Sequence, residues 1–220
     1  GNRWIERTWS GFFGTTNNLQ IKGNDTEWVI AQNPEFSLTI DGTILSPMDL
    51  GEIDVSDECS ELGATLLISK SGAGVEVSLS TTALHEVPAL VRSVSVTNRG
   101  SEAIVLESVS SEVIGWEPEG ITFLADQFRH EVTETHLCAP GEACAAAMLK
   151  QHGMIFGTLG EGEVHLQAPA QGQSQMVWPC QQTLAHMESW TAELSYLIPC
   201  GSDPFETHSR QYSEMVTQLK

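Results

Sequence analysis

The sequence predicts an all-β domain in which antiparallel sheets pack face to face, followed by one C-terminal α-helix. Apolar and polar residues alternate with the period of two that is typical of half-buried strands. Short polar or Gly-containing links separate these runs, and no helical periodicity intervenes, which argues against βαβ units. The alternating runs are residues 36–40, 66–68, 75–79, 90–97, 103–114, 164–168 and 192–198.

Two hairpins are the clearest local elements. Residues 36–40 lead into Asp41-Gly42, a dipeptide favoured in tight hairpin turns because it tolerates positive φ, and residues 43–46 are expected to form the return strand. In the second hairpin, Ser71-Gly72-Ala73-Gly74 turns the chain before the alternation resumes at Val75.

The C-terminus departs from the β pattern, and the sequence predicts a helix over about residues 203–219. Asp203 can accept a backbone N–H, Pro204 suits the first helical position, and Glu206 can reach back to complete a capping box. The apolar stripe of this helix must dock either on the sandwich or on a following domain. It consists of Phe205, His208, Tyr212, Met215, Val216 and Leu219.

Length and charge limit the partners. A chain of 220 residues is long enough for one core, so we expect a single domain over residues 1–220. The 29 acidic residues against 10 Lys and Arg give a net charge of −19, which repels phosphate backbones and anionic bilayers. The sequence also lacks the ~20 consecutive apolar residues of a membrane-spanning helix. We therefore expect neither a nucleic acid nor a membrane as partner.

The cysteine count favours a reducing compartment. The sequence has five cysteines, an odd number in a chain too large to depend on disulfides, so reduced thiols in a cytoplasmic protein are expected. Cys138 and Cys144 flank a turn that could bring two strands close enough for a bridge if the protein were exported to the periplasm or the extracellular space. The sequence leaves that alternative open.

The common catalytic motifs are absent. Neither the Gly-x-Ser-x-Gly nucleophile turn nor the Gly-x-x-x-x-Gly-Lys-Ser/Thr phosphate loop occurs. His130, His136, Cys138 and Cys144 have zinc-binding side chains, but their spacing matches no common close-paired pattern, so we predict no metal and no cofactor. With 29 acidic residues, proximity in the sequence nominates no catalytic carboxylate pair.

Two residues are candidates for contact with a sugar. Arg92 shares a strand face with Leu90, Val94 and Val96, so its charge must be paired with a carboxylate across the sheet, the commoner outcome, or used in a sugar contact. Trp116 lies in a loop-like segment and is the best candidate for an exposed indole that stacks on a sugar ring, although tryptophans more often pack in cores. The tryptophans are Trp4, Trp9, Trp28, Trp116, Trp178 and Trp190.

One part of the sequence resembles the N-terminal domain of family 36 glycoside hydrolases, the α-galactosidase family. The resemblance is carried by residues 87–93 and 94–98, followed by a turn and a strand that ends in Ser110-Ser111. Residues 153–157 and the Asp203-Pro204-Phe205-Glu206 helix start are similar to later parts of the same domain.

This resemblance implies a β-supersandwich like that of galactose mutarotase, placed before a catalytic (β/α)8 barrel. In that family the catalytic aspartates belong to the barrel, which needs ~250 residues, and no such segment follows Lys220. No catalytic residue is therefore transferred to this sequence. The implied partners are the barrel of the same polypeptide, a carbohydrate such as a galactoside, and a second copy of the domain.

The functional hypothesis is a non-catalytic supersandwich domain of an α-galactosidase-like glycoside hydrolase, which supports the barrel and contributes to carbohydrate binding or oligomerisation. The alternatives are a free-standing carbohydrate-binding sandwich and a mutarotase-like epimerase. The epimerase would use a histidine and a carboxylate to move the anomeric proton.

Overall fold

The computed structural model describes residues 1–10, 15–22, 26–115, 121–125, 128, 130–131, 135–138, 144–149, 151–160, 164–167 and 173–220. Strands in these ranges form three sheets, and every pairing among them is antiparallel. The predicted fold class, antiparallel sheets with a C-terminal helix, is confirmed.

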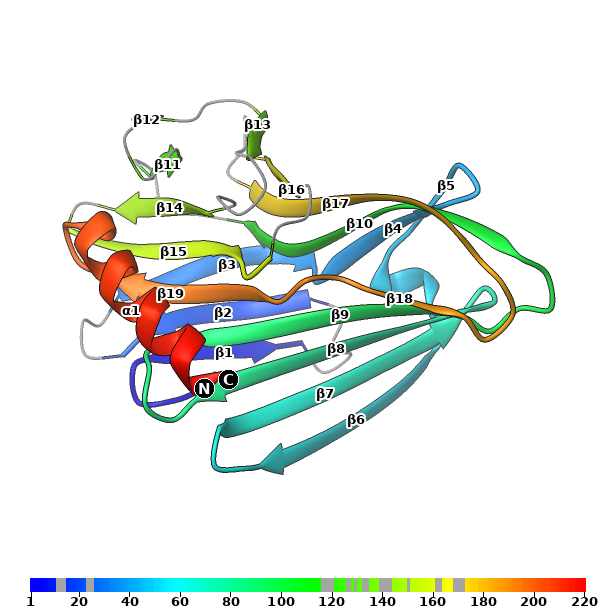
Figure 1. Ribbon diagram of the computed structural model, residues 1–220, viewed down its shortest axis with the longest axis horizontal. Helices are drawn as coiled ribbons and strands as arrows, with labels where there is room; N and C mark the ends of the chain where they lie inside the picture. The colour runs from blue at the N-terminus through cyan, green and yellow to red at the C-terminus, as the bar shows by residue number, and fades with distance from the viewer. Residues whose placement is uncertain are drawn as a thin grey trace.

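The largest sheet has ten strands, and its long strands run side by side in Figure 1. In spatial order they are β12 (His130–Glu131), β11 (Thr122–Ala125), β14 (Cys144–Leu149), β15 (His152–Thr158), β19 (Ser195–Cys200), β9 (Leu90–Asn98), β8 (Val75–Leu84), β7 (Gly63–Gly72) and β6 (Glu52–Cys59), with β18 (Ser189–Thr191) paired to β9.

The two smaller sheets have six and three strands. The six-stranded sheet has the order β13 (Thr135–Cys138), β16 (Val164–Gln167), β17 (Gln173–Leu184), β10 (Ile104–Gly115), β4 (Phe36–Ile40) and β5 (Thr43–Leu45). The three-stranded sheet consists of β1 (Ile5–Trp9), β2 (Thr15–Ile21) and β3 (Thr26–Pro34), and a short 3₁₀ turn spans Pro47–Asp49.

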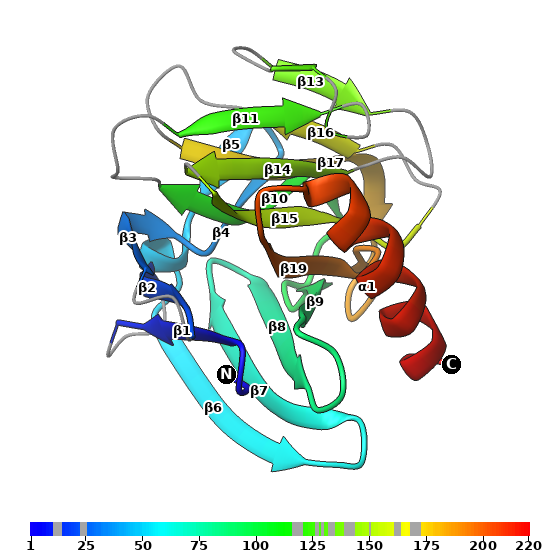
Figure 2. The same ribbon diagram turned by 90° about the vertical axis from the view of Figure 1, so that its left-hand side faces the viewer.

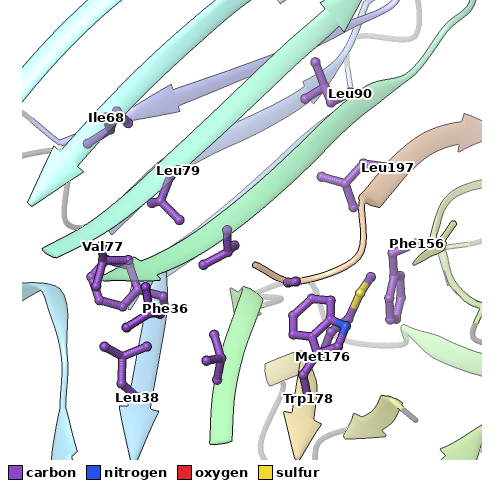
Figure 3. Packing of buried hydrophobic residues seen from close by; sticks show 14 of the residues in the cluster. Phe36, Leu38, Ile68, Val77, Leu79, Leu90, Phe156, Met176, Trp178 and Leu197 are labelled. Carbon is purple, nitrogen blue, oxygen red and sulfur yellow. The ribbon is translucent and has the colours of Figure 1, made fainter. Parts of the chain in front are cut away.

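The main core lies where the inner faces of the sheets meet. Leu79 of β8, Leu38 of β4 and Trp178 of β17 belong to one buried cluster, as Figure 3 shows. The opposite face of the large sheet is polar around β7 to β9, where a hydroxyl pair joins Ser69 to Ser78 across the strands. This division follows from the alternation of the strands, which sends successive side chains to opposite faces.

The predicted hairpin turns have the expected backbone. Asp41 and Gly42 adopt φ values of 47° and 73° between β4 and β5, and Ala73 and Gly74 adopt 49° and 78° between β7 and β8. The run expected over residues 192–198 is shifted, because β19 begins only at Ser195.

The C-terminal helix α1 (Pro204–Gln218) lies across the ends of β15 and β19 (Figure 1). Asp203 Oδ1 accepts a hydrogen bond from the Glu206 N–H at 2.9 Å, which confirms Asp203 as the N-cap, but the described helix start has no return bond from the Glu206 side chain to complete the predicted capping box. Met215 is fully buried in a second apolar cluster with Tyr196 and Ile155 of the sheet. The apolar stripe of α1 therefore docks on the sandwich, the first of the two predicted outcomes.

In the ranges that the structure describes, no helix is long and apolar enough to cross a membrane.

Candidate functional site

A buried carboxylate ties the three-stranded sheet to the large sheet. Glu35, between β3 and β4, is completely buried. Arg7 Nη2 donates to Glu35 Oε2 at 2.9 Å, and Arg92 Nη1 donates to the same oxygen at 2.7 Å. Both arginine side chains are 1% exposed. One buried negative charge thus lies between two buried positive charges that come from β1 and β9.

Threonine hydroxyl groups complete this network. Arg7 Nε donates to Thr16 Oγ1 at 2.8 Å, and the Thr16 hydroxyl donates in turn to Glu35 Oε1. Arg92 Nε donates to Thr81 Oγ1 at 3.0 Å. A buried charge is tolerated when it is paired, and the two ion pairs of Glu35, supported by the threonine hydroxyl groups, supply that pairing.

The pKa of Glu35 reflects two opposing effects, burial of the carboxyl group and its interactions with the neighbouring arginine and threonine side chains. Burial alone would raise this pKa, but the charges of Arg7 and Arg92, together with hydrogen bonds from Thr16 and Arg92, outweigh burial and hold the pKa at about 2. Glu35 is therefore ionised at neutral pH, and the network is a fixed electrostatic frame rather than a proton donor.

A cleft of about 240 Å³ opens next to this frame, between β1 and the inner face of β6 to β8. Figure 2 shows β1 passing beside these strands. The strand register places Asp57, Leu66, Thr81 and Arg92 in one row across β6, β7, β8 and β9. Arg92 is the buried end of that row, and Asp57 is its exposed end on the edge strand.

The wall opposite this row comes from β1. Its alternation directs Ile5, Arg7 and Trp9 to one face, and Arg7 and Trp9 line the cleft. The Arg7 guanidinium lies 5.8 Å from the centroid of the Trp9 ring. The Trp9 Nε1–H is buried and has no acceptor within the described part of the protein.

The cleft therefore offers an aromatic ring, a hydroxyl group and a carboxylate. This combination suits a small ligand that has an apolar face and several hydroxyl groups. Asp57 and its neighbour Glu58 both line the cleft, but successive residues of a strand point to opposite faces.

The structure bears differently on the two residues that the sequence nominated. Arg92 is paired with a carboxylate, Glu35, as the more common interpretation predicted, and a sugar contact by Arg92 stays a prediction. Trp116 lies outside the described residues, so its role also stays a prediction.

Trp9, Arg7, Glu35 and Asp57 were not singled out from the sequence. Only the alternation of Ile5, Arg7 and Trp9 could have indicated that this tryptophan shares a face with a buried strand residue.

Metal binding has no support among the described residues, where no three His, Cys, Asp or Glu side chains come together as ligands. The side chains of His130, His136 and Cys138 are outside the described part of the chain. A bridge between Cys138 and Cys144 therefore also stays a prediction.

Comparison with known proteins identifies the fold. No family model matches the chain, and no curated protein matches it in sequence. A family 36 α-galactosidase from Geobacillus stearothermophilus matches in structure with a TM-score of 0.56 at 15% identity, over 83% of this chain and 32% of that protein. The α-galactosidase from Lactobacillus brevis matches with a TM-score of 0.60 at 12% identity, over 97% and 36% of the two chains.

A putative aldose 1-epimerase from Escherichia coli K12 also has this fold. The TM-score is 0.58 at 12% identity, and the match covers 90% of this chain and 97% of the epimerase. The chain has the fold that the resemblance implied. It spans about a third of the length of the α-galactosidase structures that it matches.

Proposed function

We propose that this chain is a non-catalytic, sugar-facing supersandwich domain of an α-galactosidase-like glycoside hydrolase, and that the cleft between β1 and β6 to β8 contacts carbohydrate. The supporting observation is the cleft itself, which Trp9 and Asp57 both line beside a rigid buried charge network. A pyranose ring has an apolar face for the indole and hydroxyl groups for the carboxylate and Thr81.

The length of the chain relative to its structural neighbours supports a domain within a larger enzyme. The matched α-galactosidases are about three times as long as the region they share with this chain. The catalytic barrel of the same polypeptide would be the first partner of the domain, and a galactoside would be its ligand.

The chemistry of the cleft supports a binding role without catalysis. Hydrolysis of a glycoside needs two carboxyl groups on either side of the bond, and Asp57 and Glu58 point to opposite faces of β6. A catalytic pair of carboxyl groups would have to be supplied by another part of the enzyme.

Equilibrium titration of the purified chain with methyl α-galactoside, followed by tryptophan fluorescence, tests the proposal. We expect a Kd of about 1 mM, which corresponds to about 4 kcal/mol, and no release of galactose from a chromogenic galactoside. Asp57→Asn and Trp9→Ala should each weaken binding at least fivefold, whereas Asp54→Asn, on the opposite face of the same strand, should not.

A separate variant, Trp116→Ala, tests whether the Trp116 indole contacts the sugar. Hydrolysis by the purified chain, equal affinity of the Asp57→Asn and Asp54→Asn variants, or no binding at 50-fold the expected Kd (about 50 mM) would each contradict the proposal.

A mutarotase-like epimerase is the second candidate, favoured by the match over 97% of the putative aldose 1-epimerase. That reaction needs an acid and a base in one pocket, and the described lining of the cleft contains carboxylates but no histidine. Polarimetry of freshly dissolved galactose distinguishes the candidates. Acceleration that is lost in Asp57→Asn would favour the epimerase, and an unchanged rate would favour the binding domain.

A further inference from the structure

A second groove, of about 410 Å³, lies between helix α1 and the N-terminal sheet. Trp4 precedes β1, Lys22 follows β2, and Arg210 projects from α1, so segments that are distant in the sequence meet at the groove. It shares no lining residue with the cleft described above.

The charge of this groove is opposite to that of the protein. The chain has a net charge of −19 and only ten Lys and Arg residues. Lys22 and Arg210 are nevertheless the only Lys, Arg, Asp or Glu residues among the described residues that line the groove. A third cation, Arg3, lies with its guanidinium carbon 4.0 Å from the centroid of the Trp4 ring.

Two other cavities in the described part of the protein contain carboxylates. The cleft beside β1 contains Asp57 and Glu58 together with Arg7, and the groove at the C-terminal end of α1 contains Glu86 and Glu214.

Arg210 is the cation best able to bind a ligand. It is exposed and forms no ion pair with any described residue, whereas Lys22 pairs with Glu6 at 2.8 Å. The Lys22–Glu6 pair is 37% and 43% exposed, so water competes for both groups and the pair is readily exchanged for another anion.

Two neighbours on the same face of α1 add hydrogen-bonding groups. Thr207 lies three residues before Arg210, which places both on one face of the helix, and Gln211 is the residue four after Thr207. The Gln211 side-chain Oε1 atom is buried and has no partner within the described chain. A buried carbonyl oxygen without a partner is costly, and a ligand hydroxyl group that reached it would satisfy it.

We infer that this groove binds an oxyanion carried on a sugar ring, either the carboxylate of a uronate or the phosphate of a phosphorylated sugar. Arg210 and Lys22 neutralise the anion, Gln211 bonds a ring hydroxyl group, and the Trp4 indole contacts the ring. The planar guanidinium of Arg210 can bind either kind of oxyanion through two parallel N–H donors.

Calorimetric titration at low ionic strength with galacturonate, galactose 6-phosphate, galactose and inorganic phosphate tests the inference. At least one anionic sugar should bind tenfold more tightly than galactose and than inorganic phosphate, and the stronger of the two identifies the natural anion. Its affinity should fall when the salt concentration is raised, because surface charges are then screened.

Matched variants make the result specific. Arg210→Gln and Lys22→Gln should each lower the affinity for the anionic sugar at least fivefold. Arg99→Gln removes one charge at a distant pair with Glu76 and should have no effect. Asp57→Asn should also have no effect, so failure of the proposed galactoside cleft would leave this site intact.

Equal binding of galacturonate, galactose 6-phosphate and galactose would overturn the inference, and so would an equal loss of affinity in Arg210→Gln and Arg99→Gln.

Discussion

Replacement of Glu35 by glutamine should be strongly destabilising, because this carboxylate forms ion pairs with two buried guanidinium groups at once. Glutamine has nearly the same shape, so the change removes charge rather than volume. Arg7 and Arg92 would then repel each other in a site from which water is excluded. Removing one member of a buried ion pair typically costs about 3–5 kcal/mol.

The pKa of Glu35 gives an independent magnitude. A pKa that falls from 4.5 in the unfolded chain to about 2 in the folded protein corresponds to about 3 kcal/mol, at about 1.4 kcal/mol for each tenfold change in the proton equilibrium. Because the pKa is lowered on folding, this stabilisation is present above pH 4.5. It is lost as the pH falls toward about 2.

Urea unfolding followed by tryptophan fluorescence measures both effects, and urea is preferred because it does not screen charges. At pH 7 the free energy of unfolding of Glu35→Gln should be lower than that of the wild type by about 3 kcal/mol, and the difference should shrink between pH 4.5 and pH 2. Glu76→Gln, which breaks the partly exposed pair with Arg99, should cost less than about 1 kcal/mol. A loss below about 1 kcal/mol for Glu35→Gln would refute the reasoning.

Two further predictions concern the helix and the thiols. The Tyr196 hydroxyl group lies 2.8 Å from His208 Nε2, and burial lowers the pKa of His208 from its ordinary value of 6.5. The stability gained by docking α1 should therefore be complete above pH 6.5 and decrease as the pH falls below it, and His208→Phe should remove this dependence in thermal unfolding followed by circular dichroism. The same slope in the variant would exclude His208 as its cause. Burial raises the pKa values of Cys180 and Cys200 to about 12, so these thiols should react with a disulfide reagent only after unfolding, whereas exposed Cys59 should react first. Cys59→Ser should remove part of the fast phase of the reaction in the folded protein, whereas Cys200→Ser should leave this phase unchanged. Loss of the fast phase in Cys200→Ser would contradict the prediction.

The sequence predicts the local elements of this fold well, because each is specified by adjacent residues. The positive φ values of Asp41 and Gly42 follow from their residue types, and the Asp203 cap follows from its position before Pro204. The alternation around Val75 also predicts which residues of β8 are buried, since strand periodicity is a local property.

The candidate site could not be predicted in the same way, because its contacts join distant parts of the chain. Glu35 meets Arg92 across 57 positions, and nothing in its neighbourhood distinguishes it from the other 28 acidic residues. Arg92 could be recognised as needing a carboxylate, but the identity of that carboxylate depends on tertiary packing.

Strand β6 was missed for a related reason. All its residues are exposed, and its two aliphatic residues, Ile53 and Val55, alternate with acidic and polar ones too briefly to stand out. An edge strand that buries no side chain leaves little pattern in the sequence, and the exposed half of the cleft, including Asp57, was lost with it.

Chemical-shift mapping of backbone amides during titration with methyl α-galactoside tests the central claim most directly. The account predicts that the shifts concentrate in β1, near Trp9, and in β6 to β8, around Asp57 and Thr81, while no galactose is released. Shifts that are absent at saturating ligand or confined to α1, or turnover of the galactoside by this chain alone, would contradict it.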